Sequence, residues 1–409
     1  MPSEEGGATA RVTTGGARLM WLDALRGVGA MAVFAEHLVP WVIPSLRSYQ
    51  FSLGIYGVLV FFLVSGYIIP TSLERHADPG AFWIGRLSRL YPLYLAVCAL
   101  VLAVGPWVPP RPSVVADPSA VPAHATMLLD VLGVGGLADT MWTLSYEMVF
   151  YLLVTALYAA PGRAGGRFPA PAVPFAAAAV VAGLVLSGPP LSGTWLPWAA
   201  GAVFAAGLAC LIAGRFQVVA AYALGLMALA LLVLSSRVPW FGLAVVAVMF
   251  TGTALRRWEE GRGGLWPVAL SAALVVLAPV NAPQAGWWWV QPGVWILTIA
   301  LAAATFAGGM ALRRRRLPRV LVWLGAISYS LYLVHHPLLK YFVEITGDLR
   351  RAPLPTQVLT AVLFTAAVLL AATVTYRLVE LPGQALGRRL IARRRAARAV
   401  PSPVTAGTE

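Results

Sequence analysis

The sequence has little charge for its length, and almost none of its positive charge is lysine. Of its 409 residues, 11% are Asp, Glu, Lys or Arg, whereas soluble domains carry about 25%. Hydrophobic residues make up 59% of the chain, and the mean hydropathy is +0.77. This composition excludes a soluble globular domain and predicts an all-α helical bundle that crosses a membrane many times.

Cysteine and histidine are also scarce. The two cysteines, Cys98 and Cys210, both lie in apolar runs, so no disulfide framework is indicated. The five histidines, at positions 37, 76, 124, 335 and 336, form no H-E-x-x-H motif and do not accompany a cysteine pair. We therefore expect no metal cofactor.

Positive charge is plentiful, with a net charge of +14, but its distribution argues against nucleic acid as a partner. The arginines stand in short clusters between apolar runs. With the N-terminus in the cytoplasm, 23 of the 30 Lys and Arg residues fall on the cytoplasmic side and six on the other, as the positive-inside rule requires. Both termini are therefore predicted to be cytoplasmic. A single lysine with abundant Ala, Gly and Val is typical of a high-GC bacterium, so we expect a bacterial cytoplasmic membrane.

Twelve apolar runs are long enough to cross a bilayer. We expect them to form a transmembrane domain over residues 19–380, between a disordered cytoplasmic tail at 1–18 and a basic disordered cytoplasmic tail at 381–409. Because the runs between residues 195 and 255 are closely spaced, ten or eleven crossings would also fit. The runs are 20–43, 52–70, 88–108, 142–160, 171–187, 195–213, 217–234, 238–255, 265–281, 293–312, 320–343 and 355–376.

The first run carries four ionisable residues, Asp23, Arg26, Glu36 and His37, although a charge at the bilayer centre costs about 2.5–3.5 kcal/mol. Arg26 and His37 are eleven residues apart, which on a helix is about three turns and a rise of about 16 Å, so they share a face. In one interpretation Asp23 and Arg26 pair at the interface and His37 ends the span. In the other, His37 is a general base reached from within the membrane.

Three further groups stand in or beside apolar runs. Arg86 and Arg89 are one helical turn apart at the cytoplasmic entrance to the third run, where paired guanidinium groups can bind phosphate oxygens, although any cytoplasmic connection collects arginine. Glu147 lies in an aromatic, apolar run and calls for a proton or a basic partner from another helix. In residues 324–339, Ser and Tyr suit contacts between helices, and we expect His335 and His336 at the membrane interface.

Five blocks in this order resemble acyltransferase family 3, polytopic bacterial membrane enzymes that O-acylate surface sugars and some natural products. The first block, LDALRGVGAMAVFAEH, has the family's ten residues between Arg26 and His37, although Glu36 is unusual in it. The matching residues of the other blocks are Gly57 to Ile69; Phe82, Arg86, Arg89 and Pro92; Trp142, Leu144, Glu147, Phe150 and Tyr151; and Ile327 to Pro337.

The resemblance implies transfer of a short acyl group, acetyl above all, from acyl-CoA to a hydroxyl of a sugar-containing acceptor, either an envelope glycan or a glycosylated natural product. It implies that His37 deprotonates the acceptor or briefly carries the acyl group. Arg86 and Arg89 would hold CoA phosphates. Arg26 would position the donor or stabilise the oxyanion, and Glu147 would orient His37 or Arg26.

A transporter or flippase of a glycoside or lipid-linked sugar is the competing class, since intramembrane Arg, Glu and His can form a substrate or proton pathway. The two classes differ in what they need and produce. An acyltransferase consumes an acyl donor and forms an ester, whereas a transporter releases its substrate unchanged. The absence of an internal sequence repeat disfavours transporter folds built from duplicated halves.

Overall fold

The computed structural model describes residues 14–160, 169–282 and 286–399, and within these ranges the chain forms helices and no strand. This confirms the predicted all-α polytopic membrane fold. In chain order the α-helices are α1 (Thr14–Val42), α2 (Leu53–His76), α3 (Pro79–Val104), α4 (Pro112–Val115), α5 (Ala120–Thr126), α6 (Trp142–Ala159), α7 (Ala172–Val185), α8 (Trp195–Ala213), α9 (Gln217–Leu234), α10 (Pro239–Glu259), α11 (Trp266–Leu277), α12 (Pro292–Ala311), α13 (Arg319–Ala326), α14 (Ser328–Thr346), α15 (Leu354–Thr375) and α16 (Leu381–Ala399).

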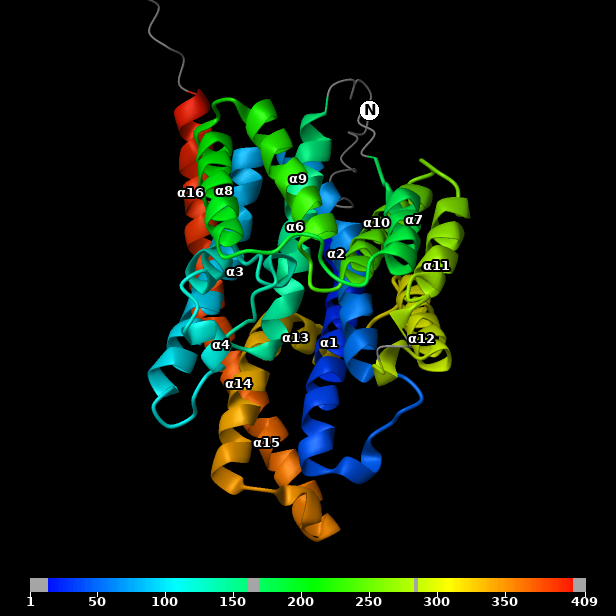
Figure 1. Ribbon diagram of the computed structural model, residues 1–409. Coiled ribbons are helices and arrows are strands. Elements are labelled where there is room, and N and C mark those ends of the chain that lie inside the picture. Colours follow the sequence, from blue (N-terminus) through cyan, green and yellow to red (C-terminus); the bar gives the residue numbers. More distant parts are fainter. Residues whose placement is uncertain (1–13, 161–168, 283–285, 400–409) are drawn as a thin grey trace, which may run out of the picture.

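The predicted apolar runs correspond to helices packed as one bundle (Figure 1). Within the described residues, eight helices are long and apolar enough to cross a membrane, and α7 and α11 are shorter apolar helices. The helices α1 and α14 complete the set of twelve runs, but their ionisable residues make them less apolar. Short 3₁₀ helices, among them η2 (Asp130–Leu132) and η3 (Asp139–Met141), lie in the long connection between α3 and α6.

The eleventh run, expected as one span over 320–343, is divided into two helices. Helix α13 ends at Ala326, and α14 begins at Ser328 after Ile327, whose φ and ψ are −89° and 2°. Helix α13 packs directly on α1, because a Cβ on Gly325 would lie 1.9 Å from the carbonyl oxygen of Asp23. The break lets α14 take its own direction (Figure 1). His335 of α14 then contacts His37 of α1.

The helices α1 and α2 cross at a pair of glycines. A Cβ on Gly29 would lie 2.8 Å from the carbonyl oxygen of Gly57, and a Cβ on Gly57 would lie 2.4 Å from that of Gly29. Small residues let two membrane helices approach to backbone contact. This close crossing fixes the face of α1 that carries Arg26 and His37.

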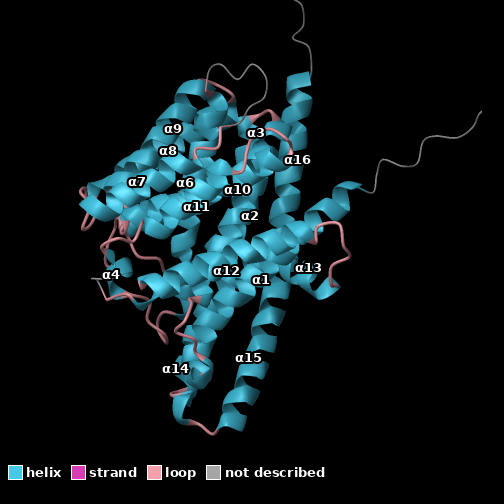
Figure 2. Cartoon of the chain, turned by 90° about the vertical axis from the view of Figure 1, so that its right-hand side faces the viewer, coloured by secondary structure: helices cyan, strands magenta, loops and turns pink. Residues whose placement is uncertain are grey.

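The prediction of a disordered tail from residue 381 is wrong for Leu381–Ala399. A π-helical turn, η7 (Tyr376–Glu380), joins α15 to α16, and α16 packs along α3. Figure 2 shows α16 above α15, which pairs with α14. The arginine content predicts a solvated tail, but Gly383 and Gly387 allow close packing against Ser88. Residues 400–409 and 1–13 of the predicted tails lie outside the described residues, and α1 already begins at Thr14.

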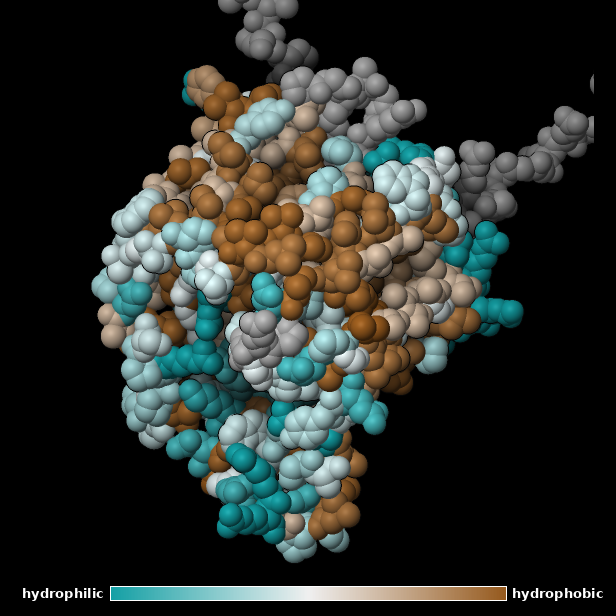
Figure 3. All heavy atoms as spheres, turned by 45° about the vertical axis from the view of Figure 1, so that its right-hand side comes forward, coloured by the Kyte–Doolittle hydropathy of each residue, from teal (hydrophilic) through white to brown (hydrophobic). Residues whose placement is uncertain are grey.

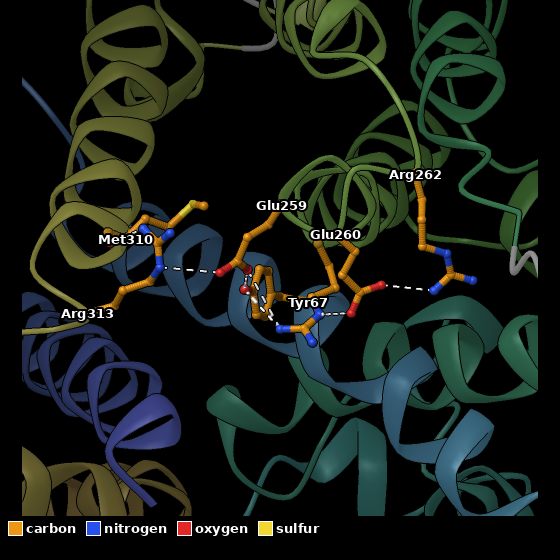
Figure 4. Close-up of polar contacts among 7 residues, drawn as sticks. Tyr67, Glu259, Glu260, Arg262, Met310 and Arg313 are labelled. Carbon is orange, nitrogen blue, oxygen red and sulfur yellow. Dashed lines mark hydrogen bonds and ion pairs between the residues drawn. The ribbon is translucent and has the colours of Figure 1, made fainter. Parts of the chain in front are cut away.

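Ion pairs at the end of α10 reach Arg313 just after α12, and a hydrogen bond adds Tyr67 of α2 (Figure 4). Tyr67 donates a hydrogen bond to Glu259, which also pairs with Arg313 at 3.2 Å. The neighbouring Glu260 pairs with Arg262 at 2.9 Å. Burial works against the charge of Glu260, but its arginine partners outweigh burial and lower the pKa of this carboxyl. The network ties the ends of α10 and α12 to α2 on the predicted cytoplasmic side.

The molecular surface is strongly divided by polarity. Figure 3 shows a broad hydrophobic face, with hydrophilic residues gathered at the lower end where α14 joins α15. Large apolar side chains of α11 are exposed, among them Trp266, Leu270 and Leu277. An exposed apolar surface of this extent suits lipid rather than water.

Candidate active site

A pair of histidines from α1 and α14 lies at the centre of the candidate site. Nδ1 of His37 is 3.1 Å from Nε2 of His335. The His335 side chain is fully buried within the protein, and its expected place at the membrane interface stays a prediction. Two residues 298 positions apart in the chain are thus brought into direct contact, because α14 turns away from α13.

The contacts of His335 determine which nitrogen of His37 is basic. Nδ1 of His335 lies 2.9 Å from the carbonyl oxygen of Leu331, which only accepts, so this nitrogen carries the hydrogen. In a neutral imidazole Nε2 of His335 then bears a lone pair and accepts from Nδ1 of His37. The free lone pair of His37 is therefore on Nε2, which this pair leaves unengaged.

The outer side of His37 is closed by His336 and a charged pair. The rings of His37 and His336 meet edge to face with centroids 5.2 Å apart. Nε2 of His336 is 3.3 Å from a carboxylate oxygen of Asp139, which forms a salt bridge with Arg111. The long connection before α6 thus contributes directly to the histidine centre. Glu36 points the other way and accepts a hydrogen bond from the backbone N–H of Gly54 at 3.2 Å.

A narrow cavity of about 30 Å³ lies between α1, α2, α6 and α14. This is room for a water molecule or two. Thr143 and Tyr332 line it and are joined by a hydrogen bond of 2.8 Å, and Val33 lines it one turn before His37. Other lining residues are Gly29, Ala30, Gly57, Val58, Phe61, Phe62, Leu144, Glu147 and Tyr329.

Arg26, Glu147 and Arg89 gather on the side of the cavity away from the histidines. The guanidinium of Arg26 is 3.9 Å from Asp23, as its spacing predicts, and lies 5.3 Å from the centre of the Phe61 ring. Both Arg26 and Arg89 are within electrostatic range of Glu147. Glu147 also accepts a hydrogen bond from Tyr151. Of the two partners expected for Glu147, Arg26 lies within electrostatic range of it, and His37 has other neighbours.

Arg86 and Arg89 line a second, larger pocket on the predicted cytoplasmic side. Its volume is about 350 Å³. Arg86 is held by a hydrogen bond of 3.2 Å to Ser72 and by the rings of Phe82 and Tyr151. The other lining residues are Ala81, Gly85, Gln384, Gly387, Arg388 and Ile391. Guanidinium groups in a pocket of this size suit a phosphate-bearing ligand.

The site residues that the sequence did not predict lie mainly outside the five sequence blocks. Asp139 stands three residues before the WTLSYE block, and Arg388 lies in the segment expected to be a tail. The adjacent histidines of α14 were visible in the sequence, but their contact with α1 was not. Within the described ranges, no three His, Cys, Asp or Glu side chains are grouped to hold a metal ion, and the absence of a metal cofactor stays a prediction.

The fold defines a multi-pass membrane protein, and a pair of contacting histidines lies inside its helical bundle. The chain matches the family model described as an acyltransferase domain over residues 19–377, and it belongs to this family. Acyltransferase MdmB of Streptomyces mycarofaciens is 26% identical over an aligned length of 420 residues, gaps included. The alignment covers 95% of this chain and 96% of that protein. The chain is therefore a membrane acyltransferase.

Other relatives match a shorter part of the chain. A putative O-acetyltransferase of Staphylococcus aureus (strain COL) is 34% identical over 90 residues, which are 20% of this chain and 13% of that protein. A putative O-acetyltransferase of strain MW2 matches to the same extent. No solved structure matches the chain.

Proposed function

We propose that the protein transfers a short acyl group, acetyl above all, from acyl-CoA to a hydroxyl of a sugar-containing acceptor. The observation that carries the proposal is the His37 and His335 pair, which leaves the lone pair of His37 on Nε2, one helical turn beyond Val33 in the cavity wall. The envelope glycans and glycosylated natural products expected from the sequence are the two acceptor classes. The putative O-acetyltransferases among the relatives favour an oxygen acceptor and acetyl as the group transferred.

The donor is proposed to enter from the cytoplasmic side. Its phosphates would bind Arg86 and Arg89 in the larger pocket, and its acyl-bearing arm would run along α1 past Arg26 toward His37. Arg26 and His37 are about 16 Å apart along the helix, too far for both to touch one carbonyl. Arg26 is therefore proposed to position the donor arm, and Glu147 to balance its charge, rather than to stabilise an oxyanion at His37.

The transfer step uses the lone pair on Nε2 of His37. This nitrogen removes the proton of the acceptor hydroxyl as the hydroxyl oxygen attacks the thioester carbonyl. The carbon–sulfur bond breaks, the CoA thiolate leaves, and the imidazolium returns the proton to the thiolate. His335 positions the ring throughout by accepting from Nδ1. Brief formation of an acyl-histidine is the alternative course.

The proposal is tested by label transfer in membranes. Radiolabelled acetyl-CoA is added to membranes containing the wild type or His37→Ala, and alkali-labile label is separated into lipid, glycan and small-molecule fractions. We expect label with the wild type, at least a hundredfold less with His37→Ala, and equal amounts of folded protein in both. The labelled fraction identifies the acceptor class.

Two outcomes would contradict the proposal. Normal label transfer by His37→Ala would remove His37 from the reaction. No label from acetyl-, propionyl- or longer acyl-CoA donors, with folded protein and supplied acceptors, would exclude acyl-CoA as the donor. Movement of an unmodified glycoside across the membrane would then favour the transporter alternative.

A further inference from the structure

A third arginine lines the cytoplasmic pocket and comes from the helix that follows the last membrane span. Arg388 of α16 stands on the wall opposite α3, which supplies Arg86 and Arg89. Its side chain is exposed at the rim, whereas the two arginines of α3 are partly buried. The pocket thus has guanidinium groups at two depths.

Helix α16 is held firmly enough to act as a wall of this pocket. A Cβ on Gly387 would lie 2.7 Å from Cβ of Ser88, and one on Gly383 would lie 2.7 Å from the carbonyl oxygen of Ser88. Farther along, Asp78 pairs with Arg394 at 2.9 Å and with Arg398 at 2.7 Å. Arg388 lies between these two attachments, so its backbone position is fixed relative to α3.

The arginines near the pocket differ in whether an acidic side chain already balances their positive charge. Arg89 lies within electrostatic range of Glu147 and Glu380. Arg394 and Arg398 are engaged by Asp78. Among the described residues, Arg388 has neither a hydrogen bond nor an ion pair. An arginine at a pocket rim with all of its donors free is suited to an anionic group of a ligand.

We infer that Arg388 binds the 3′-phosphate of CoA and that α16 is part of the donor site. The inference rests on the proposed function. In CoA the thioester sulfur and the 3′-phosphate lie at opposite ends, with the pyrophosphate between them. With the thioester directed toward His37, the pyrophosphate lies nearest Arg86 and Arg89 and the 3′-phosphate reaches the rim at Arg388. The pocket therefore selects full CoA over carriers that lack this phosphate.

The test measures the dissociation constants of CoA and 3′-dephospho-CoA for the purified full-length protein by calorimetry. We expect the wild type to bind CoA about tenfold more tightly or better, the effect of one charge-assisted hydrogen bond. In Arg388→Ala the affinity for CoA should fall to that for 3′-dephospho-CoA, while the latter stays unchanged. Arg388→Lys keeps the charge and should retain part of the preference.

Arg389→Ala is the matched control, because Arg389 is the next residue of α16, is exposed and does not line the pocket. It should keep the full preference for CoA. A preference that survives in Arg388→Ala, or one that Arg389→Ala removes equally, would overturn the inference. Wild-type protein that binds neither compound would instead contradict CoA as the donor, which separates this failure from the first.

Discussion

The two ends of the α1 face use ionisable side chains in opposite ways. At the outer end, His37 is held by another imidazole, that of His335, and the carboxylate of Asp139 lies one contact further out, against His336. At the inner end, Arg26 lies among several charges of both signs, including Asp23 and Glu147. The first arrangement leaves a base free to exchange a proton, and the second fixes permanent cations in place.

This difference predicts separate kinetic signatures for the two ends. A residue that acts only as the proton moves should affect kcat, whereas a residue that holds the donor before reaction should affect KM and the affinity for CoA. Substitutions at each end therefore test whether proton transfer and donor binding are assigned to different ends of the α1 face.

The largest effect is expected for His37→Ala. Removal of a general base lowers rates by about 10²- to 10⁴-fold, so kcat should fall by this factor. The affinity for CoA, measured by calorimetry on the same preparation, should stay unchanged because the phosphates are proposed to bind at the other end. A loss of CoA affinity as large as the loss of rate would contradict the separation of the two ends.

The reverse pattern is expected for the double variant Arg86→Ala with Arg89→Ala. Loss of two charge-assisted contacts to phosphate should raise KM for acetyl-CoA by about a hundredfold with a much smaller change in kcat. Removing Arg389 and Arg393 together makes the same change in charge from exposed positions outside the pocket and serves as the control. An unchanged dependence on acetyl-CoA concentration would remove Arg86 and Arg89 from the donor site.

A smaller effect is expected at His335, because it acts through His37. His335→Leu removes the imidazole acceptor for Nδ1 of His37 and leaves the ring its backbone contact with Val33. It should lower kcat by about 10- to 100-fold, as is usual for a group that orients a functional imidazole. His335→Gln offers an amide oxygen at a similar place and should recover part of the rate. KM for acetyl-CoA should stay constant in both. Equal rates for the two variants would exclude a role in fixing the tautomer.

The inner end of the α1 face was largely predictable from sequence, and the outer end was not. The spacing of Arg26 and His37 within one helix fixes their common face, and Asp23 pairs with Arg26 as its position predicts. The contact between His37 and His335 depends on the break at Ile327 and on helix packing across 298 residues. The local periodicity of a sequence does not indicate which residues far apart in the chain come into contact.

The segment 381–399, expected to be a tail, shows a different limit of prediction from sequence. Net charge correctly marks 381–399 as polar, and six of the chain's arginines lie there. The position of α16 depends on specific contacts: Gly383 and Gly387 let it approach α3, and Arg394 and Arg398 pair with Asp78. Spaced glycines are a recognisable packing signal, but in a segment rich in arginine they are easily taken for parts of a solvated chain.

The smallest effect is expected for Asp78→Asn, which weakens the attachment of α16 to α3. Burial works against the charge of Asp78, but hydrogen bonds and charges from Arg394 and Arg398 outweigh burial and lower the pKa of this carboxyl. Its stabilisation is therefore complete above the ordinary Asp pKa of about 3.9 and is lost as the pH falls through the lower folded-state pKa.

Thermal unfolding of the wild type and Asp78→Asn in detergent between pH 6 and pH 3 measures this contribution. We expect the wild type to be more stable by about 0.5–1 kcal/mol at pH 6, with the difference constant to about pH 5 and shrinking below about pH 4. Asp348→Asn, at an exposed aspartate paired with Arg350, is the control. A difference between wild type and Asp78→Asn that stays the same at pH 3 would show that the ion pairs do not fasten α16. The discrimination of CoA from 3′-dephospho-CoA by Arg388 should weaken in parallel, because that residue is positioned by the same helix.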